Sequence, residues 1–595
     1  MSTWVILLLL LCPPADEPVA PRRDVVVVTG VYEPVPLEEA DRAVRALPIG
    51  EEQRLLAPSA ADFLRLDPSL DLRSRAPNGV QADLSIRGGS FGQTLVLLDG
   101  MRLNDAQTGH FNLDIPAPLD ALDRVEMLKG AGSAYYGSDA VGGVINLITR
   151  KPEAAEFRLR TSGGNFGSNA QSGAAGLVWR SLSQHFSFSR DFSSGFAPNR
   201  DYRNLSLASI THASSRLGGT RVLLAHTDRP YGADQFYGNF NSWERTRTWF
   251  AAARQELGSR TDVSGAYRRH TDLFVLYRDR PQIYTNRHAV ENGQVAVRRR
   301  EPLGANVTLN YGAEGYRDSI ASTNLGNHAR GRGAGYVALD VRSLHRFAFS
   351  LAAREEFYSG GRREFSPSAS AGFWVSERLR LRAGASRAFR LPSYTELYYH
   401  DPANIGSPDL RPETAWNYEA GLDWYAGGRL RGDVTVFHRR ERDGIDYIRR
   451  SLDDIWRAAN FSELNFTGVE ISAAARVGRA QLIDFRYSGL RGASKAVDGV
   501  YTKYVFNYPV HAGLVSWEAA LAGGFIARAR LAVTDRRGRD PYAVWDAGAA
   551  YARGRLRPFL QLTNLTGTVY EEVLGVAMPG RGIAGGVELV IIGSK

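Results

Sequence analysis

The sequence contains little of what several classes of protein depend on. Only one of its 595 residues is cysteine and only four are methionine. That cysteine, Cys12, follows the apolar run Val5 to Leu11, which we interpret as the core of a secretory signal. The mature chain would then have no thiol for a disulfide or for nucleophilic catalysis. After the first dozen positions no run of 18 apolar residues occurs, and this excludes a membrane-spanning helix there.

The motifs of common enzymes are also missing. The eleven histidines are scattered, no His-Glu-x-x-His occurs, and no Gly-x-Ser-x-Gly stands between a strand and a helix. We therefore predict no enzyme, no catalytic residue and no covalent cofactor. The loop residues Asp191, Asp201 and Asp234 lack the dense spacing of metal ligands, so no metal site is predicted, although a calcium ion bound by loops remains open.

The chain is rich in glycine and aromatic residues and basic overall. It has 61 Gly, 26 Tyr and 10 Trp, with a formal net charge of +10. This composition fits a membrane β-barrel or a large soluble all-β protein. The arginines are dispersed: Arg378, Arg380 and Arg382 alternate with Leu379 and Leu381, as in a strand with one wet and one apolar face. We expect them to line a lumen and contact lipopolysaccharide, with no nucleic acid as partner.

Two-residue alternation of apolar and polar side chains runs from about residue 153 to the end. Phe157 and Leu159 alternate with Arg158 and Arg160, and turn residues separate one such segment from the next. At about 20 residues per strand and connection, this length holds about 22 antiparallel strands, as in plugged outer-membrane transporters. A soluble propeller would need a regular repeat, which is absent. We assign 153–595 to a transmembrane barrel.

The segment Ala82 to Arg150 has a different pattern, typical of a small mixed α/β domain. Asp99-Gly100 separates the apolar runs Thr94 to Leu98 and Met101 to Leu103, which predicts a tight hairpin. The β-branched run Val144 to Ile148 predicts a further strand. Upstream, Ser59 to Asp62 predicts a helix start, and Leu70 to Arg75 a strand.

Motifs in this segment resemble the plug of TonB-dependent outer-membrane receptors. They are Ile86-Arg-Gly, Leu98-Asp-Gly, Leu128-Lys-Gly and Tyr136-Gly-Ser-Asp-Ala-Val-Gly-Gly-Val-Ile-Asn146. Two further segments, Arg387 to Tyr398 and Asp409 to Thr414, are similar to sequences shared by the barrels of this family. The resemblance implies a plug, residues 37–152, inside a monomeric barrel in the outer membrane of a Gram-negative bacterium. It also implies import of a small-molecule chelate, powered through TonB and its inner-membrane energising complex.

A valine-rich segment precedes the plug. Asp24, Val25, Val26, Val27, Val28, Thr29 and Gly30 resemble the TonB box, which a periplasmic partner captures as an added strand. The alternative is an ordinary first strand of the plug. We assign residues 1–20 to the signal peptide and 21–36 to the box and its linker.

Two plug loops should face the outside by the topology of the family. Their candidate ligand contacts are Asn78, Gln81, Asp105, Gln107, Thr108, His110, Phe111 and Asn112. The alternative is that the second loop only touches the barrel wall. In a barrel loop we add Tyr231, Gln235, Phe236 and Tyr237, for which the alternative is an aromatic girdle at the membrane interface. We expect structural ion pairs with the wall from Arg87, Asp99, Arg124, Glu126 and Lys129.

The identity of the imported ligand follows less directly from the sequence than the fold does. The compact length and the loop around Gln235 resemble the cobalamin-type receptors of the family, which makes a corrinoid the first hypothesis. Ferric siderophores and haem remain alternatives, and Arg278 and Arg280 would suit anionic ferric chelates. A passive porin or adhesin would lack both box and plug. One departure from the family is the end of the chain, Ile591-Ile-Gly-Ser-Lys595, where an aromatic residue is usual.

Overall fold

The computed structural model describes residues 26–27, 29–30, 35–57, 59–344, 346–461, 463–494 and 499–592. The predicted signal segment therefore lies outside the described residues, as do Asp24, Val25 and Val28 of the predicted TonB box. Among the residues described, no helix has the length and apolar character needed to cross a membrane.

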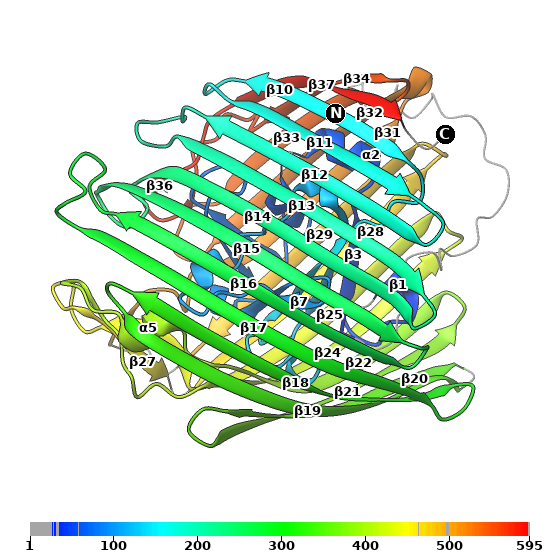
Figure 1. Cartoon of the computed structure of the whole chain (residues 1–595), viewed down its shortest axis with the longest axis horizontal. Helices are drawn as coiled ribbons and strands as arrows, with labels where there is room; N and C mark the ends of the chain where they lie inside the picture. Colours follow the sequence, from blue (N-terminus) through cyan, green and yellow to red (C-terminus); the bar gives the residue numbers. More distant parts are fainter. Residues whose placement is uncertain are drawn as a thin grey trace.

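The larger part of the chain is a closed antiparallel barrel of 22 strands (Figure 1). This confirms the predicted strand number. The last strand pairs with the first, with Leu159 opposite Leu589, so the barrel has no free edge. Its strands are β10 (Glu156–Gly164), β11 (Asn169–Val178), β12 (Leu182–Ser193), β13 (Tyr202–Ser215), β14 (Gly218–Asp234), β15 (Asn241–Leu257), β16 (Thr261–Val275), β17 (Thr285–Pro302), β18 (Val307–Ser322), β19 (Gly326–Leu344), β20 (Phe347–Tyr358), β21 (Arg362–Ser376), β22 (Leu379–Arg390), β24 (Glu413–Ala426), β25 (Leu430–Arg442), β28 (Leu464–Val477), β29 (Gln481–Ala493), β31 (Pro509–Ala520), β32 (Phe525–Arg536), β33 (Tyr542–Tyr551), β34 (Leu556–Thr563) and β37 (Gly582–Ile592).

Alternation along each strand sorts the side chains between the two faces of the wall. On β12, Phe186 and Phe188 are exposed on the outside, whereas His185 and Ser187 are buried inside. On β22, Leu381 is 44% exposed while Arg380 is 2% exposed. Successive side chains of a strand point to opposite faces, so an apolar outer wall and a polar lumen arise from the same pattern.

The N-terminal part fills the lumen of the barrel. Its strands form a five-stranded sheet of order β3-β8-β9-β6-β7 and the pairs β1-β2 and β4-β5. The elements are β1 (Val26–Val27), β2 (Val35–Pro36), η1 (Leu37–Glu39), β3 (Val44–Pro48), α2 (Glu51–Leu56), α3 (Ala60–Leu64), β4 (Leu70–Ser74), β5 (Ala82–Ile86), η2 (Phe91–Gln93), β6 (Thr94–Leu98), β7 (Met101–Arg102), η3 (Gly109–Phe111), η4 (Leu119–Ala121), β8 (Leu122–Lys129), α4 (Ser133–Tyr136) and β9 (Gly143–Thr149).

The local predictions for the plug hold. Asp99 and Gly100 both adopt positive φ, 52° and 80°, and turn β6 into β7 as a hairpin. Ser59 caps α3 by accepting a hydrogen bond from the amide of Asp62. β9 ends at Thr149 and β10 begins at Glu156, so the assigned boundary between residues 152 and 153 lies in the segment that joins them.

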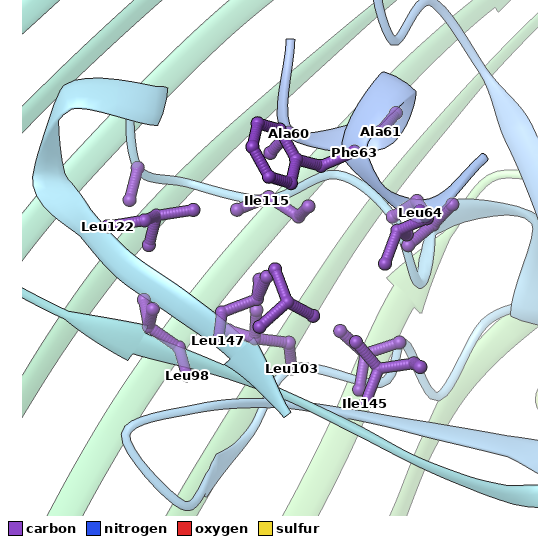
Figure 2. Packing of buried hydrophobic residues seen from close by; sticks show 14 of the residues in the cluster. Ala60, Ala61, Phe63, Leu64, Leu98, Leu103, Ile115, Leu122, Ile145 and Leu147 are labelled. Atoms are coloured by element: carbon purple, nitrogen blue, oxygen red, sulfur yellow. The ribbon is translucent and has the colours of Figure 1, made fainter. Parts of the chain in front are cut away.

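The plug has its own apolar core, and the barrel wall completes it. Figure 2 shows Phe63 and Leu64 of α3 above Ile145 and Leu147 of β9, with Ile115 between the two layers. On the wall side the same cluster continues into β13, β14 and β15 through Ala208, Ile210, Leu223, Ala225 and Phe250. Each fully buried aliphatic or aromatic side chain stabilises the fold by about 1.5–3 kcal/mol, so this core fastens the plug to one sector of the wall.

The two ends of the barrel differ in their connections. At one end, which we call the short-turn end, strands are joined by a few residues, such as 216–217 or 478–480. At the opposite, long-loop end lie the connections 391–412, 443–463, 494–508 and 564–581. These carry the remaining elements: α5 (Tyr394–Tyr398), β23 (Asn404–Ile405), β26 (Gly444–Arg449), β27 (Trp456–Phe461), β30 (Tyr501–Thr502), β35 (Glu571–Val573) and β36 (Val576–Ala577), with η5 (Ala522–Gly524) at the short-turn end.

Ion pairs join the rest of the plug to the wall, and three of the five residues predicted to make such pairs do so. Arg87 pairs with Glu419 and Glu470 at 2.9 Å each, Lys129 lies 3.6 Å from Glu470, and Asp99 lies 2.8 Å from Arg221. The prediction is wrong for Arg124, whose ion pairs are with Asp123 and Glu126 of its own strand. Glu126 accepts a hydrogen bond from Thr29 of the predicted TonB box, because its strand crosses the plug interior beneath that segment.

Asp67 is the charge at which several plug elements meet, and its loss should loosen the plug. Burial raises the pKa of this carboxyl, but Lys129 and Arg45, at 3.1 and 3.3 Å, outweigh burial and hold the pKa well below its usual range. A lowered pKa contributes stability above the unfolded value of about 3.9, and this stability is lost as pH falls below it. We expect Asp67→Asn to destabilise the plug by about 3–5 kcal/mol at neutral pH.

Hydrogen exchange of plug peptides in guanidinium, followed by mass spectrometry from pH 7 to pH 3, would measure the stability of the plug in the parent protein and in Asp67→Asn. The stability difference between the two proteins should shrink below about pH 4, because the unfolded parent chain takes up a proton at Asp67 there and the asparagine of the variant takes up none. Asp123→Asn is the matched control, since Asp123 is exposed and pairs with its neighbour Arg124. A stability difference between Asp67→Asn and the parent protein that stays constant with pH would contradict the ionic explanation.

Candidate functional site

The plug loop 104–112 reaches the long-loop end, but much of it is turned towards the wall. Asp105 accepts a hydrogen bond from Arg268 at 2.7 Å and lies 2.9 Å from the His270 ring. Gln107 donates to Asp272 at 3.2 Å, and the Phe111 ring lies 4.9 Å from that of His270. The predicted ligand contacts Asp105, Gln107 and Phe111 are all buried. Their contacts are those of the alternative in which this loop meets the barrel wall, and their ligand role stays a prediction.

His110 and Thr108 are the more accessible members of this loop. The Nδ1 atom of His110 lies 2.6 Å from Asp83, and Thr108 caps the short helix η3. The His110 ring stacks on Phe91 at 4.2 Å and meets the edge of Tyr504 at 6.0 Å. We call Phe91, His110 and Tyr504 the aromatic triad. Asn112 supports it by donating to the carbonyl of Phe91 at 3.2 Å and accepting from the Asp105 amide.

Sequence reasoning missed two members of the aromatic triad. Phe91 lies in η2, two residues beyond the glycines of the Ile-Arg-Gly motif. Tyr504 belongs to the connection between β29 and β31, and the buried carboxylate of Asp446 holds it there by accepting from the amides of Tyr504 and Val505, both at 2.8 Å. Only the folding of a long barrel loop over the plug brings these rings together.

The second plug loop, 75–81, meets the predicted barrel loop directly. Asn78 donates to the Tyr202 hydroxyl at 2.8 Å, and Gln81 donates to that of Tyr237 at 2.8 Å. Tyr237 and Tyr231 in turn donate to Glu244 at 2.6 and 2.7 Å. These hydrogen bonds join the barrel wall to the end of the plug that carries loops 75–81 and 104–112, which we call the plug apex.

The aromatic residues of this loop face the plug and do not form a membrane girdle. Tyr231 and Phe236 are buried in a cluster with Ala76 and Val80 of the plug. Tyr237 remains 38% exposed, and Gln235 is exposed at a positive φ of 62°. The girdle alternative is therefore wrong for Tyr231 and Phe236, whereas Tyr237 and Gln235 keep surface available for a ligand.

A small extra sheet at the long-loop end connects these loops to the plug. It has the order β23-β27-β26-β30 and is built from three different barrel connections. Tyr447 of β26 donates to the carbonyl of Thr395 in α5 at 3.0 Å, and the amide of Thr395 donates to the carbonyl of Gln107 at 3.0 Å. Direct hydrogen bonds through α5 therefore link the plug loop 104–112 to the outer loops.

The described part of the predicted TonB box is docked against the plug at the other end. The Thr29 hydroxyl donates to Glu126 at 2.7 Å and accepts from the Asn146 amide at 3.1 Å. Glu126 and Asn146 face each other across β8 and β9, so one threonine binds both strands. The amide of Gly30 donates to the Tyr136 hydroxyl at 3.1 Å, and Val27 is fully buried in its pairing with Val35.

The site holds no evident metal cage. Among the described residues, no group of three or more His, Cys, Asp or Glu side chains is arranged to bind a metal ion. His328 is occupied by contacts within the protein: its Nε2 atom lies 2.7 Å from the carbonyl of Leu325, and its ring stacks on Tyr398 at 3.7 Å. The loop-bound calcium ion stays an untested expectation.

Two family models match the two parts of the chain. The TonB-dependent Receptor Plug Domain matches residues 36–144, and the model described as TonB dependent receptor-like, beta-barrel matches residues 165–569. Together they cover most of the chain, and their limits agree with the plug and the barrel seen in the structure.

Curated relatives are proteins of the same kind. The Vitamin B12 transporter BtuB of Vibrio vulnificus (strain YJ016) is 26% identical over 465 residues, which is 72% of each chain. The Iron-regulated outer membrane virulence protein of Vibrio cholerae serotype O1 (strain ATCC 39315 / El Tor Inaba N16961) is 26% identical over 421 residues, 62% of each chain.

Solved structures share the fold at lower identity. A point mutant of the ferric enterobactin receptor PfeA from Pseudomonas aeruginosa superposes with a TM-score of 0.77 at 16% identity, covering 95% of this chain and all of that one. The siderophore receptor PirA from Acinetobacter baumannii gives a TM-score of 0.76 at 14% identity, covering 92% and 98%. The matched plug, the plugged 22-stranded barrel and these relatives together assign the chain to the TonB-dependent receptors, transporters of the Gram-negative outer membrane that are not enzymes.

Proposed function

We propose that this receptor imports a corrinoid of the cobalamin type. The observation that carries the proposal is the chemistry of the plug apex, where the aromatic triad and the Tyr237–Gln81 pair offer ring faces and amide groups. Of the nearby cations, Arg75 lies 3.2 Å from Asp83 and Arg278 donates to Asp201 at 3.0 Å, whereas Lys503 donates to the side-chain oxygen of Asn404 at 3.0 Å. Such a surface suits a large amphipathic ligand without strong net charge. The relatives named vitamin B12 transporters support the same cargo.

A ferric siderophore or haem is the second candidate. Arg280, 56% exposed beside Arg278, could bind an anionic chelate, and similar folds include receptors named for siderophores and enterobactin. A passive porin or adhesin is disfavoured, because a plug with its own core and buried ion pairs fills the barrel.

Import requires energy from the periplasmic side. In our proposal the C-terminal domain of TonB captures Asp24 to Gly30 by adding a strand, and pulling breaks the contacts of Thr29 and Gly30 with the plug. Ligand binding at the apex promotes this by favouring a state in which the box is released. The inner-membrane energising complex supplies the force. We further propose that the receptor acts as a monomer in contact with lipopolysaccharide.

Calorimetric titration of the detergent-solubilised receptor tests the cargo. We expect cyanocobalamin to bind in the nanomolar range and a panel of ferric siderophores and haemin not to bind. Tyr504→Ala should weaken corrinoid binding by about 1 kcal/mol, roughly fivefold, because it removes one ring of the aromatic triad. Tyr311→Ala is the matched control, since Tyr311 is exposed on the wall near the short-turn end.

The outcomes separate the candidates. Binding of one ferric chelate without the corrinoid would overturn the cobalamin proposal and leave the receptor assignment intact. Equal affinity in Tyr504→Ala and the parent protein would show that the ligand lies away from the aromatic triad.

A further inference from the structure

The connections at the short-turn end share one residue type. Ten of them join the strand pairs β11–β12, β13–β14, β15–β16, β17–β18, β19–β20, β21–β22, β24–β25, β28–β29, β31–β32 and β33–β34. All but 303–306 and 521–524 contain an arginine. Among the described residues of these ten connections, Glu377 is the one carboxylate. Positive charge therefore gathers around this rim of the barrel.

The arginines fall into two sectors of the rim, with Arg260 as an additional member. The first arginine sector, between β11 and β22, is Arg180, Arg216, Arg346 and Arg378. The second arginine sector, between β24 and β34, is Arg429, Arg479, Arg553 and Arg555. All of these side chains are exposed. We call the two sectors and Arg260 the arginine ring.

Most of the arginine ring has no carboxylate partner. Arg260 lies 2.9 Å from Glu301, and Arg346 donates to the carbonyl of Val375 at 3.2 Å. In the described part of the chain, no ion pair joins the members of the first or second arginine sector to an acidic side chain. Structural arginines of this protein are buried and paired, as Arg380 is with Asp41 at 2.6 Å. The guanidiniums of the two arginine sectors are thus available to a partner outside the chain.

Apolar side chains on the outer wall place the arginine ring at a membrane surface. Trp179, Leu217 and Phe525 are 54%, 65% and 52% exposed in or beside the short turns, and Trp424 is 43% exposed at the end of β24. Aromatic residues of this kind mark the level where hydrocarbon meets headgroups. Arg180 and Arg216 are the neighbours of Trp179 and Leu217 in the same short turns, so the arginines stand at that level. In outer-membrane barrels the short turns face the periplasm, so this is the inner leaflet.

We propose that the arginine ring binds the phosphate groups of anionic glycerophospholipids in the periplasmic leaflet. A guanidinium matches a phosphate with two parallel hydrogen bonds. A protein partner would dock on one sector, whereas these charges extend from β11 to β34 around the rim. Lipopolysaccharide lies in the opposite leaflet and does not reach them. Such binding would hold the barrel at a constant depth while the plug is pulled inwards.

Native mass spectrometry of the full chain in detergent micelles tests the proposal. The protein is titrated with phosphatidylglycerol or with phosphatidylcholine of the same acyl chains. We expect phosphatidylglycerol to bind about tenfold more tightly, with a preference that falls as ammonium acetate is raised, because each guanidinium near an anionic headgroup strengthens binding about fivefold. Replacing either arginine sector by glutamine should reduce the preference, and replacing both should remove it.

A matched variant controls for the loss of four charges. It carries Arg362→Gln, Arg363→Gln, Arg450→Gln and Arg457→Gln, all exposed at the long-loop end, and should keep the lipid preference of the parent protein. Faster migration of unheated samples on a denaturing gel reports that each barrel is folded. If the variant with all eight substitutions does not fold, the two variants with four substitutions each provide the test. Equal binding of the two lipids to the parent protein, or sector variants that match the control, would overturn the proposal.

Discussion

Deletion of residues 24–30 is expected to abolish energised uptake while leaving ligand affinity within about twofold of the parent protein. The described residues of this segment contact β8, β9 and α4 at the end of the plug away from the aromatic triad. Without it TonB has no strand to capture, so no force reaches the plug. Uptake of radiolabelled ligand by cells that express each protein, beside calorimetry on the purified receptors, measures both quantities.

A pair of substitutions at Val27 tests the mechanism more closely. Val27→Pro removes a backbone N–H that an added strand would need, and should abolish uptake as the deletion does. Val27→Ala keeps that amide and loses only side-chain burial, so uptake should persist. Normal uptake by the deletion variant would refute energised import. A loss of binding would instead show that the deletion had disturbed the plug.

Replacement of Arg87 is expected to unseat the plug. Arg87 holds Glu419 and Glu470 at 2.9 Å each and lies 4.3 Å from the centre of the Phe437 ring. Arg87→Gln would remove the cation that two buried carboxylates share, leaving Glu419 with Arg42 at 3.1 Å and Glu470 with Lys129 at 3.6 Å, at a cost of about 3–5 kcal/mol. Because an empty barrel of this width leaks, cells should become sensitive to large antibiotics, and single-channel recordings in planar bilayers should show frequent openings.

The controls for this variant separate charge from backbone strain. Arg87 has a positive φ of 51°, a conformation that costs any side chain other than glycine. Arg87→Lys shares that strain but keeps a cation, so its leak should be smaller than that of Arg87→Gln. Arg124→Gln removes an arginine that pairs only with plug carboxylates among the ion pairs described, and should not leak. Equal leakage from Arg87→Lys and Arg87→Gln would show that charge is not the cause.

Much of this protein follows from patterns that are local in the sequence. Alternation of Phe186 and Phe188 with Ser187 assigns each side chain to one face of a strand, and repetition of that pattern yields the number of strands. Asp99-Gly100 predicts its own hairpin because both residues tolerate positive φ. The plug, the barrel and the receptor family could therefore be predicted without coordinates.

Only the tertiary structure shows which residues of the plug contact which residues of the barrel wall. Asp105 and His110 stand in one polar loop, yet the first is buried against Arg268 and the second stacks on Phe91. Likewise Thr29 finds Glu126 only because the plug sheet crosses beneath the box. A strand's period specifies the face of a side chain but not its partner, and partners here depend on barrel closure and on how the plug is seated within it.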